Sequence, residues 1–91
     1  MTEVIKRGGK RQAFNSAKIK KALKGAAREA GLSSSKTEKL VEEVGDSVIS
    51  FFKKKRVVKS TDIRRSIIGR LNRRSKSVAV AWKRHDRKKK R

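Results

Sequence analysis

Residues 4–14 read Val4-Ile5-Lys6-Arg7-Gly8-Gly9-Lys10-Arg11-Gln12-Ala13-Phe14, a run that predicts two short strands, Val4 to Arg7 and Lys10 to Phe14. Glycine at both central positions permits the positive φ angles of a two-residue hairpin turn. In that register Ile5 and Gln12 share one face with Phe14, whereas Lys6 and Arg11 face the other way. A lone hairpin is only marginally stable in water, so we expect this one to pack on helices.

Four helices are predicted after the hairpin, because capping residues precede apolar stripes at helical spacing. The first runs from about Ala17 to Ala30 and ends before Gly31, a typical stop signal. Their cap candidates are Asn15 or Ser16, Ser35 in a capping box, Ser60 and Ser77. The stripes are Ile19, Leu23, Ala26 and Ala30; Leu40, Val41, Val44, Val48, Phe51 and Phe52; Ile63, Ile67 and Leu71; and Val78, Ala81, Trp82 and His85.

These elements predict a mainly α fold in which an N-terminal β-hairpin packs on a four-helix bundle. The second helix extends to about Lys54 and has the longest apolar stripe. We expect one domain over residues 1–82 and a basic C-terminal arm over residues 83–91, which can continue the last helix.

The net positive charge of the chain predicts a polyanionic partner. Its 29 Lys and Arg residues outweigh 8 Asp and Glu, which gives a net charge of +21. Such a charge repels itself unless phosphates or counterions neutralise it. The excess lies in the second half, and the cations that we expect to contact nucleic-acid backbone phosphates are Lys53, Lys54, Lys55, Arg56, Arg65, Arg73, Arg74, Arg87, Lys88, Lys89, Lys90 and Arg91.

Several classes of function are disfavoured by what the sequence lacks. It has no Cys and one His, so a zinc or thiolate site is not expected. Its carboxylates are dispersed, which argues against a metal-dependent hydrolase or any other enzyme. No apolar run approaches the roughly 20 residues that span a bilayer, so we expect no membrane partner. The expected location is the cytoplasm, at the nucleoid if the protein binds DNA.

The hairpin itself is a candidate anion site. Lys6 and Arg7 stand beside the glycine turn, and the first helix begins a few residues later. An ammonium, a guanidinium and backbone N–H groups around one point would suit a di- or triphosphate. The alternative is a basic hairpin whose charges lie in water, as most charge runs do.

This stretch resembles the signature of the ATP-cone, the nucleotide-sensing domain of ribonucleotide reductases and of the repressor of their genes. That signature begins Val-x-Lys-Arg-Asp-Gly, as Val4 to Gly9 do except at Gly8, and continues with a Phe-Asp-like pair and Lys-Ile, here Phe14-Asn15 and Lys18-Ile19. The segments Ser60-Thr61-Asp62-Ile63 and Val78-Ala79-Val80-Ala81-Trp82 are also similar to that family. The resemblance covers most of the chain.

The resemblance implies a regulatory site for ATP or dATP, with or without Mg²⁺, and no hydrolysis. Cations would neutralise the phosphates, and residues at the start of the third helix would lie near the base or sugar. One late basic residue, among Lys83, Arg84 and Arg87, would complete the phosphate shell. The positions that correspond to nucleotide contacts are Val4, Lys6, Arg7, Gln12, Asn15, Lys18, Ser60 and Arg64.

Two functions therefore stand side by side. The first is an ATP- or dATP-binding regulatory module with an electrostatic nucleic-acid surface, either monomeric or oligomeric. The alternative is a DNA- or RNA-binding, chromatin-like protein without sequence specificity, on an ATP-cone scaffold that has lost nucleotide binding. Phe14, Phe51, Phe52 and Trp82 all fit apolar stripes, so we expect them in the core rather than as platforms for stacked bases.

Overall fold

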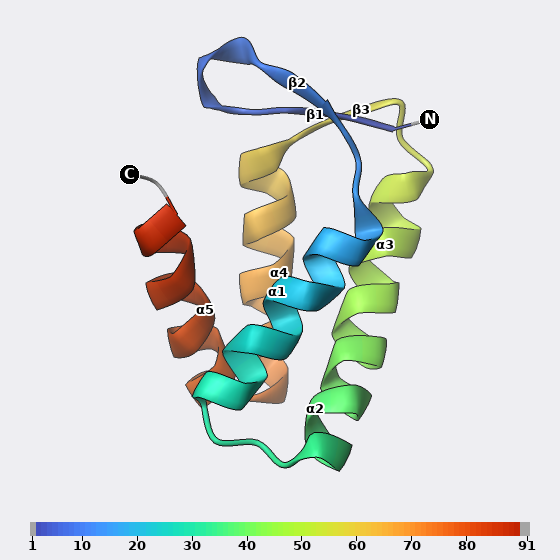
Figure 1. The fold of residues 1–91 in the computed structure, drawn as a ribbon. Coiled ribbons are helices and arrows are strands. Elements are labelled where there is room, and N and C mark those ends of the chain that lie inside the picture. Colours follow the sequence, from blue (N-terminus) through green and yellow to red (C-terminus); the bar gives the residue numbers. More distant parts are fainter. Residues whose placement is uncertain (1, 90–91) are drawn as a thin grey trace.

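The computed structural model describes residues 2–89, together with their side chains except those of Arg7 and residues 85–89. A small sheet lies at one end of a helical bundle (Figure 1), which confirms the mainly α fold with an N-terminal hairpin. The elements are β1 (Glu3–Ile5), a 3₁₀ turn (Arg7–Gly9), β2 (Arg11–Ala13), α1 (Ser16–Glu29), α2 (Ser34–Leu40), a π-helical segment (Val41–Gly45), α3 (Asp46–Lys53), β3 (Val57–Lys59), α4 (Ser60–Arg74) and α5 (Lys76–Lys89).

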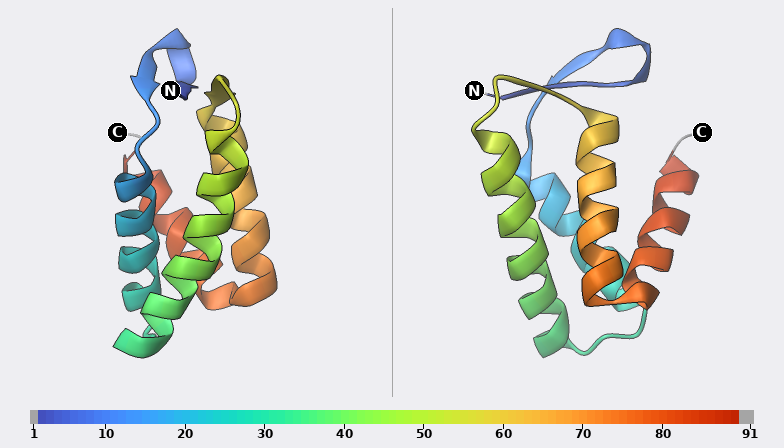
Figure 2. Two further views of the ribbon diagram at one scale, coloured as in Figure 1. Left: turned by 90° about the vertical axis from the view of Figure 1, so that its right-hand side faces the viewer. Right: turned by 180° about the vertical axis from the view of Figure 1, so that it is seen from behind.

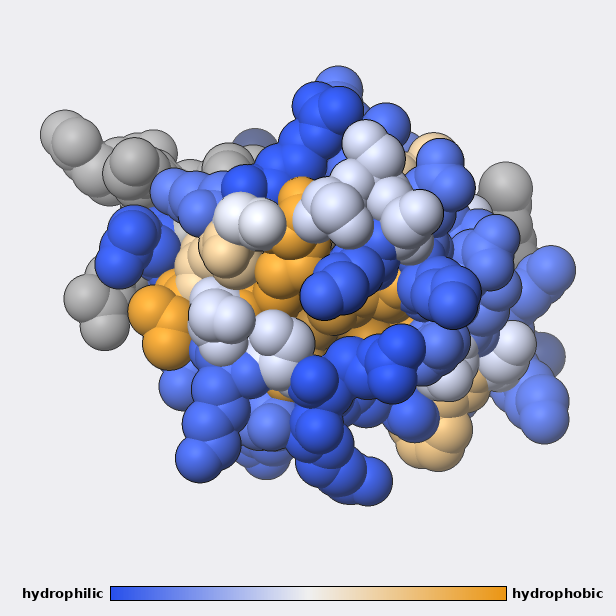
Figure 3. Space-filling model, turned by 90° about the horizontal axis from the view of Figure 1, so that it is seen from below, coloured by the Kyte–Doolittle hydropathy of each residue, from blue (hydrophilic) through white to orange (hydrophobic). Residues whose placement is uncertain are grey.

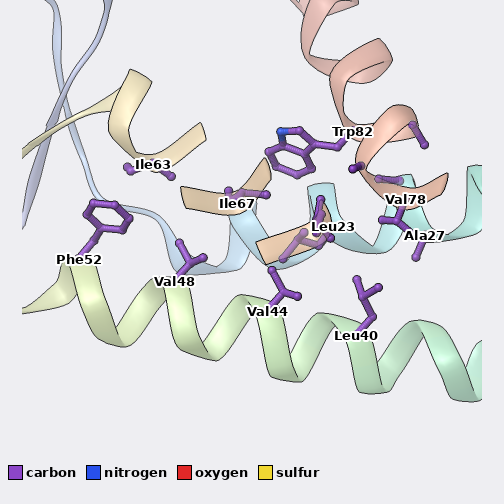
Figure 4. Close-up of a cluster of buried hydrophobic side chains, with 14 of the residues drawn as sticks. Leu23, Ala27, Leu40, Val44, Val48, Phe52, Ile63, Ile67, Val78 and Trp82 are labelled. Atoms are coloured by element: carbon purple, nitrogen blue, oxygen red, sulfur yellow. The ribbon is translucent and has the colours of Figure 1, made fainter. Parts of the chain in front are cut away.

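The core lies where α1, α4, α5 and the long α2–α3 helix meet. Leu23, Ile67 and Val78 come from three different helices, and each is at most 1 % exposed. Figure 4 shows these side chains converging with Val48 and Trp82 between the helices. Each large apolar side chain that is fully buried contributes about 1.5–3 kcal/mol. The bundle is thus held together by the stripes that the sequence predicts.

The hairpin turn is one residue longer than predicted. Val4 pairs with Gln12 and Ile5 with Arg11, so Arg7, Gly8 and Gly9 together form the connection. Both glycines have φ of 86°, which explains why glycine occupies these positions. The predicted facing of Ile5 with Gln12 is therefore wrong, because a one-residue shift in register exchanges the two faces of a strand.

A third strand, absent from the sequence prediction, completes the sheet. β3 pairs in parallel with β1, and Ile5 lies opposite Lys59, so the strand order is β2-β1-β3. Val4 and Val58 face each other on the side of the helices and are both buried, at 9 % and 5 % exposed. This pairing attaches the hairpin to the start of α4.

Local capping signals place most helix ends. The Asn15 side chain accepts a hydrogen bond from the Lys18 N–H at 3.1 Å, and Gly31 follows α1 with φ of 87°. The cap of α2 is Ser33 rather than the predicted Ser35. No side-chain cap precedes α4 at Lys59, and α5 begins at Lys76, before the predicted cap Ser77.

The π-helical segment brings the α2–α3 helix close to α1. A Cβ added at Gly45 would lie 3.3 Å from Lys20 Cγ and 3.6 Å from Leu23 Cδ1, so glycine permits this approach. The apolar residues Leu40, Val44, Val48 and Phe52 recur every four positions, and all are buried. A regular α-helix would rotate such a stripe by about 40° at each step, and one wider turn reduces that drift.

One core prediction is wrong. Phe51 is 51 % exposed, whereas its neighbour Phe52 is 3 % exposed. Successive residues of an α-helix point about 100° apart, so the two rings cannot both face a narrow core. The Phe51 ring instead packs edge-on against Phe52, with 5.0 Å between centroids, and the Lys55 ammonium lies 5.2 Å from its centre.

The end of the bundle opposite the sheet carries the α1–α2 and α4–α5 connections. Figure 3, seen from below, shows an apolar area framed by hydrophilic side chains at this end. A hollow of about 350 Å³ there is lined by Leu32, Lys36, Lys39, Leu40, Arg74 and Ser75.

Candidate nucleotide site

The hairpin turn presents basic residues at the outer end of the sheet. The turn is closed by hydrogen bonds from the Lys6 N–H to the Lys10 carbonyl at 2.7 Å and from the Gly9 N–H to the Lys6 carbonyl at 3.0 Å. The Lys6 side chain is exposed. The Arg7 side chain lies outside the described residues. An exposed ammonium on a turn of fixed backbone can contact an anion with little rearrangement.

The hairpin leads directly into α1. The Phe14 N–H donates to the Thr2 carbonyl at 2.9 Å, and the Asn15 cap begins the helix immediately afterwards. Lys18 is exposed in the first turn of α1, where helix N–H groups and the helix dipole favour anions. The Asn15 oxygen is engaged by the Lys18 N–H, so its role in the fold is that of a helix cap.

The parallel pairing of β1 with β3 brings the start of α4 to the same place. Ile5 lies opposite Lys59, and the next residues along the two strands are Lys6 and Ser60. The carboxyl ends of parallel strands are a common location for ligand sites. Arg64 lies one turn further along α4 and, like Ser60, is half-buried. Two predicted regions 54 residues apart thus meet at one edge.

The underside of the hairpin faces the helices. Val4 is buried there, so its side chain packs in the core, and its cross-strand partner Gln12 shares that face but is exposed. Figures 1 and 2 show the end of α5 rising toward the hairpin. Lys83 and Arg84 are exposed on this helix, whose backbone is helical through Lys89. The Arg87 side chain is not among those described.

Trp82, on α5, is assigned by the sequence to the core alone. The residue is 8 % exposed, which confirms the core role. Its indole Nε1 is nevertheless buried without a hydrogen-bond partner among the described residues. In Figure 4 this nitrogen lies on the side of the ring away from α3. In the sequence, the only sign of this buried N–H donor is that a tryptophan stands within an apolar stripe.

The described cations among the predicted nucleic-acid contacts are spread along α3 and α4. Lys53, Lys54, Lys55 and Arg56 are exposed at the C-terminal end of α3, and Arg65 is exposed in the first half of α4. Arg73 and Arg74 stand at the far end of α4, about two turns or more from Arg65. Arg74 also pairs with Glu43 at 2.9 Å. The predicted contacts at Arg87, Lys88, Lys89, Lys90 and Arg91 fall outside the described side chains.

Two observations limit the other chemistry of the described residues. Among the side chains that the structure describes, no group of three or more His, Asp or Glu residues is placed to hold a metal ion. Within residues 2–89, no helix combines the length and the apolar character that crossing a membrane requires.

The sequence matches the family of the ATP cone domain over residues 2–91. The match spans essentially the whole chain, and the protein therefore belongs to the ATP-cone family. Comparison with curated proteins gives no match. Membership identifies the chain as a nucleotide-sensing regulatory module, in agreement with the resemblance seen at Val4 to Gly9.

Proposed function

We propose that this protein binds ATP or dATP as an effector at the hairpin end of the bundle. The observation that carries the proposal is the β1–β3 pairing, which places Lys6 and Ser60 at adjacent strand ends. A nucleotide that extends from there along the hairpin would reach the first turn of α1, which begins beside Thr2. The hairpin, the first turn of α1 and the start of α4 would then contact one nucleotide, so the binding affinity would depend on how these three segments are positioned.

Each part of the site has a distinct role in this proposal. Lys6, Arg7 and Lys18 neutralise phosphates through charge-assisted hydrogen bonds. Ser60 and Arg64 lie toward the base or sugar, and a late cation of α5 completes the phosphate shell. Gly8 replaces the Asp of the family signature, so no carboxylate in the turn opposes the phosphates. Val4 supports the site indirectly, because its buried side chain packs against the core and holds the sheet in place.

Mg²⁺ can accompany the phosphates in this site, bound mainly through their oxygens. The described acids do not gather around the hairpin, and Glu3 pairs with Arg11 at 3.2 Å. Hydrolysis would require carboxylates for metal ions and a residue that orients water. The nucleotide is therefore proposed as a signal rather than a substrate.

Calorimetric titration of the whole chain tests this function. ATP and dATP should each bind with saturable heat, because a built site contacts base, sugar and phosphates together. Inorganic triphosphate, which matches only the charge, should bind more weakly. Identical isotherms for ATP and triphosphate at about 150 mM salt would show nonspecific attraction to a cationic protein and would contradict the proposal.

A second function, electrostatic binding to nucleic acid, is favoured by the exposed cations at the end of α3 and by the net charge of +21. Removal of residues 86–91 takes away five cations and one anion. Binding to duplex DNA should weaken alike for all sequences, because these residues contact phosphates. The slope of log K against log salt should flatten by about 0.9 for each phosphate that is no longer neutralised.

Fluorescence anisotropy at several salt concentrations measures that slope. The body should stay folded in the shortened chain, because the buried stripe of α5 consists of Val78, Ala79, Ala81 and Trp82. Circular dichroism serves as the control for folding. If the intact protein shows no association with duplex DNA at about 50 mM salt, the second function is excluded.

A further inference from the structure

A groove is lined by residues of α3 and α4, whose backbones can be followed in the right-hand view of Figure 2. It consists of three hollows of about 560, 650 and 250 Å³ in order from the sheet. The first two share Phe51 and Lys55, and the second and third share Ser47 and Arg70. The hollows therefore adjoin one another, and together they are called here the α3–α4 groove.

The middle hollow concentrates groups that recognise phosphate and aromatic rings. Its charged lining residues are all cations, namely Lys54, Lys55 and Arg70. Ser47 and Ser50 add exposed hydroxyl groups. Of the acids that line the two flanking hollows, Asp62 lies near the sheet and Glu43 is already paired with Arg74. The groove is thus electrostatically complementary to a chain of phosphates.

Arg70 lines the middle and third hollows and is half-buried. Its Nε is buried and has no hydrogen-bond partner among the described residues. That atom is closed to solvent, so it does not itself face a ligand in the groove. Guanidinium groups match phosphate oxygens through paired N–H donors. The Arg70 guanidinium is therefore the candidate contact for a phosphate in the middle of the groove.

Phe51 supplies the second half of the recognition. Its ring is 51 % exposed beside four consecutive cations, and Lys55 lies over it at 5.2 Å. An exposed ring within a basic groove is the arrangement by which proteins stack bases of single strands. In a duplex the bases are already stacked and paired, so a half-exposed side chain cannot reach their faces.

We propose that the α3–α4 groove binds single-stranded nucleic acid, with a base stacked on Phe51 and the backbone following Lys54, Lys55 and Arg70. Successive hollows are offset by about four helical residues, or about 6 Å, which is roughly the reach of one nucleotide in an extended strand. The inference rests on the second function above and assigns it a site and a ligand class. It differs from the nucleotide site, which uses the hairpin, the first turn of α1, and Ser60 and Arg64 at the start of α4.

Binding of fluorescently labelled dT12 to the full chain tests the groove. Phe51→Ala should weaken this binding about 5- to 150-fold, the range typical for removal of one base–aromatic stack. Binding to a 12-base-pair duplex should change less than about twofold. Phe51→Trp should retain dT12 binding, because the indole preserves a stacking face. Val80→Ala is the matched control, because Val80 is 53 % exposed and lies on α5.

The outcomes separate the groove from the broader function. Equal dT12 affinity in the Phe51→Ala and Val80→Ala variants, with duplex binding intact, would overturn the groove alone. Absence of all nucleic-acid binding would overturn both. Competition with ATP or with poly-glutamate tests two other ligands. If ATP displaces dT12, and this displacement is abolished in Phe51→Ala, the groove binds a free nucleotide. If poly-glutamate does so, the groove binds an acidic protein, and either result would contradict the single-strand proposal.

Discussion

Replacement of Lys6 and Arg7 together by Ala should reduce the affinity for ATP at least about 100-fold. Each of these residues is proposed to form charge-assisted contacts with phosphate, and each such contact is worth about 1.5–3 kcal/mol. Two contacts amount to about 3 kcal/mol or more, and every 1.4 kcal/mol is a factor of about ten. Calorimetric titration of the variant gives the change directly.

A matched variant distinguishes this site from general charge attraction. Lys36→Ala with Lys39→Ala removes the same two charges from exposed positions on α2, at the end of the bundle away from the sheet. We expect that variant to bind ATP within about threefold of the unchanged protein, because distant exposed charges are screened. An equal reduction in both double variants would reject the hairpin as the nucleotide site.

Phe52→Ala should lower the free energy of unfolding by about 3–5 kcal/mol, because it leaves a large cavity under the sheet. Phe52 is 3 % exposed and lies in the core beside Val48 and Ile63. A chain of this length is expected to have a total stability of about 5–14 kcal/mol, so the variant will be at the edge of folding. Urea denaturation followed by circular dichroism measures the decrease.

The adjacent residue provides the control for that experiment. Phe51→Ala should cost only about 1–1.5 kcal/mol, because half of the ring is in water and its edge-on packing against Phe52 is the main interaction removed. The two variants remove the same side chain from neighbouring positions of one helix. Similar decreases for both would show that the Phe51 ring is buried in solution, which would also remove the stacking platform from the groove.

The helices could be predicted because their signals are local. Asn15 accepts from an N–H three residues later, and Gly31 adopts the positive φ that ends α1. Ile63, Ile67 and Leu71 lie on one stripe and are all buried. Local signals could not predict which of Phe51 and Phe52 is buried, because both side chains are large and apolar. Only the position of α4 determines which of the two faces the core.

The sheet and the site were less predictable because they depend on distant pairing. Val57–Lys59 is a three-residue strand without a turn signal, and its partner β1 lies 54 residues earlier. The resemblance to the ATP-cone points to both Lys6 and Ser60, but only the parallel register explains why they are neighbours. The α3–α4 groove was missed because Ser47, Arg70 and Phe51 form no linear motif.

The β1–β3 pairing also fixes the order in which the protein can mature on the ribosome. A hairpin forms within about 1–10 μs, whereas synthesis proceeds at about 5–20 residues per second. The 54 residues that separate Glu3 from Val57 therefore take about 3–11 s to make. During that interval the hairpin lacks the strand that ties it to α4. The proposed nucleotide site at Lys6 and Ser60 cannot form in a nascent chain before Ser60 has been translated.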